Sequence, residues 1–313
     1  MNPALQGYLA AVSEQLAADG TLATAADELA AVSSLVDGNN ELTLALDDGS
    51  VPAASRRAVL DDLLDGKVLP AVRRVVNRAV TVVPASEVTA ALHWLAHQSA
   101  AVAARAADGT PEGDLPILGR LASRNRVAGY AAAVFEMVET GEIEEIEDQL
   151  FRFARTVESN PALRTALGDR DLPATLRQGV VTDLLGGKAN PATVRLAAYA
   201  VKAGRARDIV GTLDALVEAA ARARGWRVAR VVASDEVADA QRRGLSEALG
   251  RLAGAPVELQ VTVDPSLLGG VVIQVGDLLV DGSARHRLDQ VAEHLLGSEA
   301  DYHVPQGRET ADG

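Results

Sequence analysis

The sequence contains no cysteine, and only 3% of its 313 residues are aromatic. Without cysteine the chain can form neither a disulfide nor a thiolate metal site, and cysteine usage does not restrict the compartment. Because large aromatic side chains are scarce, a buried core must be built mainly from Ala, Val and Leu. Alanine has the highest helix propensity, so this composition favours closely packed helices.

Basic residues are too few for a nucleic-acid-binding protein. The chain has 30 Lys and Arg residues against 43 Asp and Glu residues, which gives a net charge of −13. Nucleic acids and anionic lipid surfaces attract basic proteins, because positive side chains replace the counterions of phosphate groups. The charge therefore disfavours both kinds of partner, and no nucleic-acid partner is expected.

Long apolar runs are also missing. The most apolar stretches carry a charge or a glycine every few residues, and none reaches the about 20 apolar residues that a membrane-spanning helix needs. Residues 1–6 lack the basic region and the apolar run of a secretory signal. We therefore expect a cytoplasmic protein without direct membrane insertion.

The chain contains an internal repeat. Segment 42–67 reads like segment 163–188, and the same offset of 121 residues holds without a gap from about residue 27 to beyond residue 95. A one-residue shift aligns the earlier pair Gly7-Tyr8 with Gly129-Tyr130. The matched pairs include Asn39 and Asn160, Pro52 and Pro173, Arg56 and Arg177, Asp62 and Asp183, Leu63 and Leu184, Leu64 and Leu185, Gly66 and Gly187, and Pro70 and Pro191. The chain thus begins with two copies of one module.

Each copy has the pattern of a helical bundle. Apolar residues recur at helical spacing from Tyr130, and Gly141 ends that run. Asn160 is a natural helix cap, followed by Pro161 at the first helical position. Similar Asp or Asn and Pro pairs recur further along, so we predict five to six short helices in each copy.

No pattern of catalytic or ligand-binding residues stands out. The chain lacks a glycine-rich phosphate-binding motif, so a nucleotide cofactor has little support. His93 and His97 have a spacing that metal ligands use on a helix. However, the second copy has Asp214 and Glu218 at these positions, which indicates a solvated face. The acidic residues of segment 142–148 fit a helix N-terminus, where they complement the dipole. We predict no catalytic residue, no metal and no cofactor.

The C-terminal part changes to the period of β-strands. Segments 226–233 and 257–263 alternate apolar and polar residues, and a helix is predicted between them from about residue 235 to residue 252. Segments 270–275 and 278–281 flank Gly276-Asp277, a pattern typical of a type II′ hairpin.

A last helix is predicted after Ser283, a natural cap, to end near Gly297. The polar tail that follows is predicted to be disordered. The fold class is therefore α plus α/β: two tandem helical bundles and a small β-α-β-β-α domain.

The end of the chain carries a longer pattern. It reads D-P-S-L-L-G-G-V over 264–271, V-G-D over 275–277, D-G-S over 281–283 and R-L over 287–288. This pattern resembles the C-terminal signature of the F-type ATP synthase delta subunit, the family of the mitochondrial oligomycin-sensitivity-conferring protein. We assign structural roles to its residues, with the glycines shaping a bulge and turns. They are Asp264, Gly269, Gly270, Gly276, Asp277, Asp281, Gly282, Ser283, Arg287 and Leu288.

The second helical copy resembles the same family. Its Y-A-A-A-V-F segment, 130–135, matches the Tyr-Ala-x-Ala opening of the family's helical domain, and the resemblance covers 127–296. Ordinary members have one helical domain, so this chain is similar to the long delta subunits of high-GC actinobacteria, some of which are fused to a membrane-anchored b-type segment. The first copy has drifted, since Tyr8 is followed by Leu9 rather than alanine.

The resemblance implies a non-catalytic stator subunit present in a single copy in a hetero-oligomeric complex at the cytoplasmic face of the membrane. The helical domain would hold the N-terminal helix of an alpha subunit, and the C-terminal domain would hold the C-terminal end of the b stalk. The predicted alpha-binding residues lie on two helices of the second copy. They are Tyr130, Ala131, Ala133, Val134, Leu196, Ala197, Ala200 and Val201. A helical-repeat scaffold unrelated to ATP synthase is the alternative.

The predicted organisation has five segments. They are a first, diverged helical repeat (1–107), a linker (108–124), a second helical bundle (125–225), an α/β domain (226–297) and a disordered tail (298–313).

Overall fold

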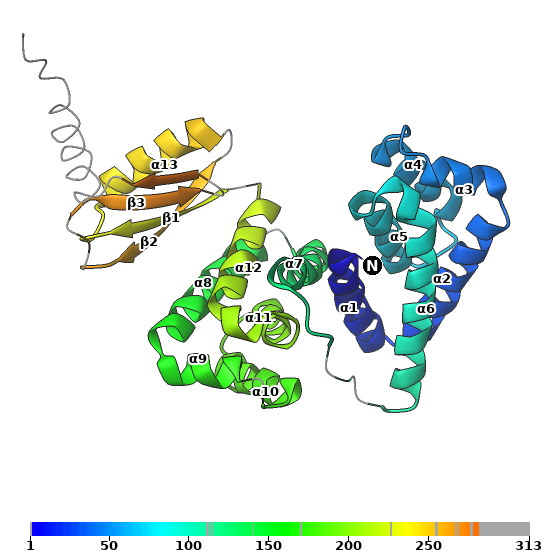
Figure 1. Ribbon diagram of the computed structural model, residues 1–313, viewed down its shortest axis with the longest axis horizontal. Helices are drawn as coiled ribbons and strands as arrows, with labels where there is room; N and C mark the ends of the chain where they lie inside the picture. The colour runs from blue at the N-terminus through cyan, green and yellow to red at the C-terminus, as the bar shows by residue number, and fades with distance from the viewer. Residues whose placement is uncertain are drawn as a thin grey trace, which may run out of the picture. The chain divides into compact units, whose positions relative to one another are not determined.

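The computed structural model describes residues 2–110, 113, 115–139, 141–169, 171–225, 227–253, 256–265, 267, 269–275 and 278–281. The chain divides into two compact units, Met1–Arg224 and Gly225–Gly313. The described part of the first unit is helical, and that of the second combines one helix with a β-sheet (Figure 1).

The first helical set consists of the helices α1 to α6. They are α1 (Pro3–Ala18), α2 (Leu22–Asp37), α3 (Asn40–Asp47), α4 (Ala53–Leu64), α5 (Pro70–Val82) and α6 (Val88–Ala107), with the 3-10 turn η1 (Ala85–Glu87) before α6. Polar caps begin several of these helices. The Asn2 side chain accepts from the backbone N–H of Ala4, and the Asn39 side chain accepts from that of Leu42. Each cap satisfies an N–H group that has no partner within its helix.

The second helical set consists of the helices α7 to α12. They are α7 (Arg120–Met137), α8 (Glu142–Ser159), α9 (Pro161–Gly168), α10 (Ala174–Leu185), α11 (Pro191–Ala203) and α12 (Ile209–Ala223), with η2 (Ala206–Asp208) before α12. The predicted cap at Asn160 is confirmed, because its side chain accepts from the backbone N–H of Leu163. Asn190 caps α11 in the same way.

The two helical sets correspond element by element. The short helices α3 and α9 both have 8 residues, α4 and α10 both have 12, and α5 and α11 both have 13. Two matched arginines also make the same contact. Arg56 donates to the carbonyl oxygen of Leu46 at 3.0 Å, and Arg177 donates to that of Leu167 at 3.4 Å. That this correspondence arose by duplication remains a prediction.

One predicted boundary is wrong. The proposed linker 108–124 includes the start of α7, because the helix begins at Arg120 rather than after residue 124. Arg120, Leu121 and Ala122, which follow Gly119, are good helix formers. The predicted linker therefore ended too late, since it counted these residues with the polar stretch upstream. The two sets also pack into one compact unit, with α1 in contact with α7.

The second unit is built on a sheet with the strand order β2-β1-β3-β4. Its elements are β1 (Arg227–Ala233), α13 (Asp239–Ala253), β2 (Val257–Val263), β3 (Val271–Val275) and β4 (Leu278–Asp281). Strand β1 pairs in parallel with β2 and antiparallel with β3, and β3 pairs antiparallel with β4. The residues Ala229, Val231 and Ala233 are buried, so the predicted alternation of β1 is confirmed.

The predicted order β-α-β-β-α has one strand too few before the final helix. The two segments predicted on either side of Gly276-Asp277 are confirmed as the antiparallel strands β3 and β4, and Val275 lies opposite Leu278. The predicted helix at 235–252 begins later, at Asp239. The hairpin turn, the helix predicted after Ser283 and the tail lie outside the described residues.

Part of the signature is described. Gly269 and Gly270 have φ angles of 83° and 88°, in the left-handed region that favours glycine, where the chain enters β3. Asp264 follows β2 and donates its backbone N–H to the carbonyl oxygen of Ala233 at 2.8 Å. Asp281 is the last residue of β4. The remaining signature residues lie outside the described part: Gly276, Asp277, Gly282, Ser283, Arg287 and Leu288.

Candidate partner-binding site

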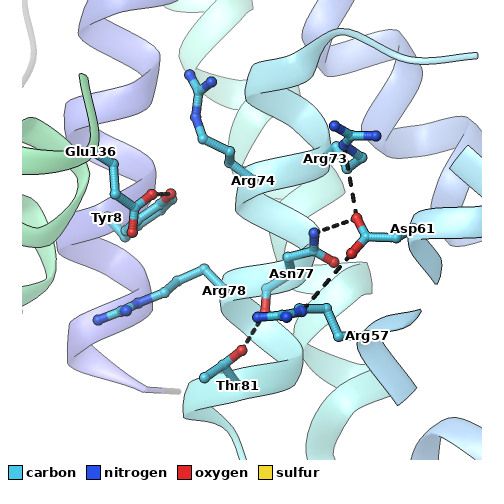
Figure 2. Close-up of a pocket in the computed structure, with 9 residues that line it drawn as sticks. All are labelled: Tyr8, Arg57, Asp61, Arg73, Arg74, Asn77, Arg78, Thr81 and Glu136. Atoms are coloured by element: carbon cyan, nitrogen blue, oxygen red, sulfur yellow. Dashed lines mark hydrogen bonds and ion pairs between the residues drawn. The ribbon is translucent and has the colours of Figure 1, made fainter. Parts of the chain in front are cut away.

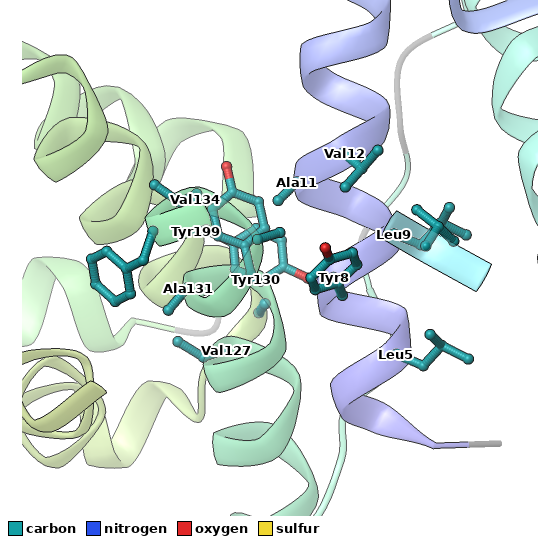
Figure 3. Packing of buried hydrophobic residues seen from close by; sticks show 14 of the residues in the cluster. Leu5, Tyr8, Leu9, Ala11, Val12, Val127, Tyr130, Ala131, Val134 and Tyr199 are labelled. Atoms are coloured by element: carbon teal, nitrogen blue, oxygen red, sulfur yellow. The ribbon is translucent and has the colours of Figure 1, made fainter. Parts of the chain in front are cut away.

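The helices α1 and α7, which begin the two helical sets, pack directly against each other (Figure 3). A Cβ atom added at Gly7 would lie 1.8 Å from the backbone oxygen of Arg126, and one added at Gly129 would lie 1.8 Å from that of Ala4. Only glycine permits this approach of two backbones. Because Gly7 and Gly129 are matched positions of the repeat, each helix contributes the same small residue to the crossing.

Two hydrogen bonds across this crossing are reciprocal. The hydroxyl of Tyr8 donates to the carboxylate of Glu136, and the hydroxyl of Tyr130 donates to Glu14 at 2.5 Å. The two tyrosines are matched positions, and so are the two glutamates, each pair 122 residues apart. Each helical set therefore supplies the donor of one bond and the acceptor of the other.

The surroundings of the two tyrosines differ. Tyr130 stacks on Tyr199 of α11, with ring centroids 3.7 Å apart and an interplanar angle of 10°. At the position that matches Tyr199 the first set has Arg78, whose guanidinium lies 5.4 Å from the ring centroid of Tyr8. A cation over an aromatic face is attractive, so Arg78 stabilises the ring in a different way.

Helix α11 also contacts α1. The guanidinium of Arg195 donates to the backbone oxygen of Ala11 at 3.4 Å and lies 3.5 Å from the carboxylate of Glu14. Arg126 of α7 in turn donates to the backbone oxygen of Ala203 at 2.6 Å, at the end of α11. A cation at a helix C-terminus is stabilised by the dipole, although burial lowers the pKa of Arg126. These contacts hold α1, α7 and α11 together.

All eight residues predicted to bind an alpha-subunit helix lie in the core. None is more than 1% exposed: Tyr130, Ala131, Ala133, Val134, Leu196, Ala197, Ala200 and Val201. Their burial follows from the position of α7, which α1, α11 and α12 all contact. The structure does bring the two predicted helices together, and α1 of the same chain packs against α7 on the side of Tyr130, whereas Ala131 and Val134 point toward the second helical set (Figure 3). Their contact with a partner stays a prediction.

Sequence reasoning missed the residues that build this crossing. Gly7 and Gly129 were aligned, but the match alone does not show that they face each other. Glu14 and Glu136 are 122 residues apart, like the two tyrosines. A search for polar residues with this offset on the helices of the tyrosines would have found them. Arg195 gave no signal of this kind.

The other polar candidates make ordinary contacts. His93 lies 2.9 Å from the carboxylate of Asp37 in an exposed pair. Within the described ranges, no group of three or more His, Cys, Asp or Glu side chains is placed to hold a metal ion. No helix of the described part is both long and apolar enough to cross a membrane.

The two reciprocal tyrosines are expected to make the protein less stable at alkaline pH. Burial raises the pKa of Tyr130 and of Tyr8, and the acceptor glutamates Glu14 and Glu136 raise it further. The folded protein therefore keeps both phenols protonated at a pH at which the unfolded chain releases their protons, near about pH 10. Above this pH the unfolded state binds fewer protons than the folded state. The contribution of the two tyrosines to the free energy of unfolding is therefore fully present below this pH and is lost as the pH rises.

We expect the free energy of unfolding to fall above about pH 10 by up to ~1.4 kcal/mol per pH unit for each tyrosine. Urea denaturation between about pH 9 and pH 11 measures the slope. The double variant Tyr8→Phe/Tyr130→Phe should have a shallower slope. An unchanged slope would show that the alkaline loss comes from other groups.

Comparison with known proteins places the chain in a family. Residues 127–295 match the family described as ATP synthase delta (OSCP) subunit. The "ATP synthase subunit delta" of Nocardia farcinica is 34% identical over 262 residues, which cover 83% of this chain and 85% of that protein. That of Kineococcus radiotolerans is 42% identical over 166 residues, and the chain spans only 60% of its length.

A third relative has a longer chain. The "ATP synthase subunit b-delta" of Mycobacterium sp. (strain KMS) is 42% identical over 154 residues, which are 49% of this chain and 35% of that protein. The family match begins within α7 and includes α8 to α12 and the sheet, and the alignment with the Nocardia farcinica protein covers most of the chain. The chain belongs to the ATP synthase delta (OSCP) subunit family.

Proposed function

We propose that this chain is a non-catalytic stator subunit of an F-type ATP synthase, which links the catalytic head to the peripheral stalk and resists the torque of the rotor. The observation that carries this proposal is the family match over 127–295, which spans the second helical set and the sheet. A scaffold made only of helical repeats would not need the second unit, so the alternative is not favoured. The complex would hold the chain at the cytoplasmic face of the membrane.

We propose separate attachments for the two units. The helical unit would bind the N-terminal helix of an alpha subunit, and the second unit would bind the C-terminal end of the b stalk. The name of the Mycobacterium relative, "ATP synthase subunit b-delta", supports an association with b. The division of the chain into two compact units also fits an adaptor with two partners.

The proposed alpha site carries a structural condition. The face of α7 that holds Tyr130 and Ala131 is buried, and α1 packs on α7. An alpha-subunit helix could lie in the same place only if the first helical set moved away from the second. Helix-in-groove docking buries apolar side chains of an amphipathic helix without any reactive group. We therefore propose that the partner helix competes with α1 for this face.

The proposal is tested by assembling the full chain with purified alpha and b subunits and weighing the complex by native mass spectrometry. We expect one copy of the chain to join alpha and b in the same particle. Omitting the chain should leave alpha and b unassociated. ATP hydrolysis by the purified chain alone, or particles in which it joins neither subunit, would contradict the proposed role.

A further inference from the structure

A polar cavity of about 410 Å³ lies beside the crossing of the two helical sets (Figure 2). Residues of α5 line it over two helical turns, from Arg73 to Thr81, and Arg57 and Asp61 of α4 line another wall. The hydrogen-bonded pair of Tyr8 and Glu136 completes it. We call this space the arginine cavity, because four of its nine lining residues are arginines.

Two of these arginines have no carboxylate partner. Arg73 lies 2.6 Å from Asp65 and 3.8 Å from Asp61, and Arg57 lies 3.9 Å from Asp61. Among the residues that the structure describes, no carboxylate lies within ion-pair distance of Arg74 or Arg78. In a chain with a net charge of −13, this cavity carries a local excess of positive charge.

Three buried polar atoms in the cavity have no hydrogen-bond partner in the described part. They are Nε of Arg74, Nε of Arg78 and Oδ1 of Asn77. The amide nitrogen of Asn77 is engaged, since it donates to Asp61 at 2.7 Å. Buried polar atoms are almost always hydrogen-bonded, so a cluster of them indicates a ligand. A ligand that satisfies this cluster would accept hydrogen bonds from the two arginines and donate one to Oδ1 of Asn77.

The matched positions of the second helical set differ from the residues that line the arginine cavity. Arg195 matches Arg74 but is engaged by Glu14 and by the backbone of Ala11. Tyr199, which matches Arg78, stacks on Tyr130. Val194 and Ala198 stand where the first set has Arg73 and Asn77. At these positions the second set therefore has a paired arginine and a tyrosine in place of Arg74 and Arg78, so the packing of the repeat does not require the two cations.

We propose that the arginine cavity binds an acidic peptide segment of a partner protein. Carboxylates of the segment would accept from Arg74 and Arg78, which are one helical turn apart, about 6 Å along α5. An amide N–H of the segment would donate to Oδ1 of Asn77. A peptide supplies both acceptors and donors, whereas a free phosphate at neutral pH supplies mainly acceptors, so the combination favours a peptide. The inference does not rest on the proposed stator function.

The test uses the full chain and a fluorescein-labelled peptide of alternating glutamate and glutamine, with an all-glutamine peptide as the reference. Fluorescence anisotropy should show binding of the acidic peptide that weakens with added salt. The double variant Arg74→Gln/Arg78→Gln should lose at least about tenfold in affinity, because two charge-assisted hydrogen bonds are removed. Arg74→Lys, which keeps the charge, should retain part of the binding.

Arg105→Gln on the exposed surface of α6 is the matched control for Arg74→Gln, since each change removes one positive charge. Its affinity should equal that of the unmodified chain. If the double variant unfolds, Arg74→Gln alone decides the matter, because Arg74 is not the arginine over the ring of Tyr8. Equal affinity of this variant and the unmodified chain would overturn the proposal.

Two further outcomes would also overturn it. Equal binding of the all-glutamine peptide would show that carboxylates are not recognised. Inorganic phosphate that binds more tightly than the acidic peptide, with the same dependence on Arg74, would assign a small-anion site instead.

Discussion

Replacement of Gly7 by alanine is expected to lower the free energy of unfolding by about 3 kcal/mol. The new methyl group would overlap the backbone oxygen of Arg126, which no change of side-chain rotamer can relieve. Either α1 moves away from α7 or both helices distort. Urea denaturation followed by circular dichroism measures the loss, and hydrogen exchange should show faster exchange in α1 and α7 than elsewhere.

Gly179→Ala is the matched control for this change. Gly179 lies within α10, and an added Cβ atom there meets nothing within 4 Å. Alanine in a helix interior is favoured over glycine, so this variant should gain about 0.5–1 kcal/mol. A loss at Gly179 as large as that at Gly7 would show that the close approach is not the cause.

The Gly7 variant also tests the proposed alpha site, because it leaves the amino-acid sequences of α7 and α11 unchanged. If a partner helix competes with α1, a loosened crossing raises the fraction of chains in which the face is open. A labelled peptide from the alpha N-terminus should then bind more tightly to Gly7→Ala than to the unmodified chain. Equal affinities would place the partner on another surface.

Replacement of Arg224 by methionine is expected to cost about 3 kcal/mol. Arg224 follows the C-terminus of α12, and its guanidinium lies 2.9 Å from the carboxylate of Glu147 on α8. The side chains are only 12% and 3% exposed. Methionine fills similar space but removes a cation that attracts a buried carboxylate, and the lost attraction is the origin of the loss. Thermal or urea unfolding measures it.

Two comparisons separate the charge from the packing in this prediction. Arg222→Met, two residues earlier, removes an arginine that is 52% exposed and 3.8 Å from Glu218, and it should cost less than about 0.5 kcal/mol. The double variant Arg224→Met/Glu147→Ala should recover part of the loss, because the first set has the buried Ala26 at the position of Glu147. No recovery would contradict the electrostatic explanation.

Local features of the fold were predictable because they depend on neighbours in the sequence. The cap at Asn160 and the strand Val257–Val263 both appear as expected, although burial along this strand does not alternate. The start of α7 was not predictable to the residue, since Arg120 follows Gly119 in a stretch without a capping side chain. The two segments predicted on either side of Gly276-Asp277 are the antiparallel strands β3 and β4, although the summary order β-α-β-β-α counted them as one strand.

The candidate site shows where sequence reasoning reaches its limit. Tyr130 and Leu196 were correctly expected on helices that pack together, but the hydroxyl of Tyr130 donates to Glu14 of α1, more than a hundred positions earlier in the chain. No local pattern records which segment covers a helix face. Arg74 and Arg78 were not singled out, because arginines on a helix are usually solvated. They are distinguished by lining one cavity and by having no carboxylate within ion-pair distance in the described part of the chain.

The reciprocal contact between the two helical sets has a further consequence for any competitor. The sets are joined by residues 108–119, between the end of α6 and the start of α7. A tethered segment rebinds at an effective concentration fixed by its tether, in the millimolar range for a short flexible connection, whatever the protein concentration. Dilution therefore does not open the crossing. A partner helix can displace α1 only through its own affinity and its local concentration. Occupancy of this face by a partner would therefore depend on assembly with that partner and not on the concentration of this chain.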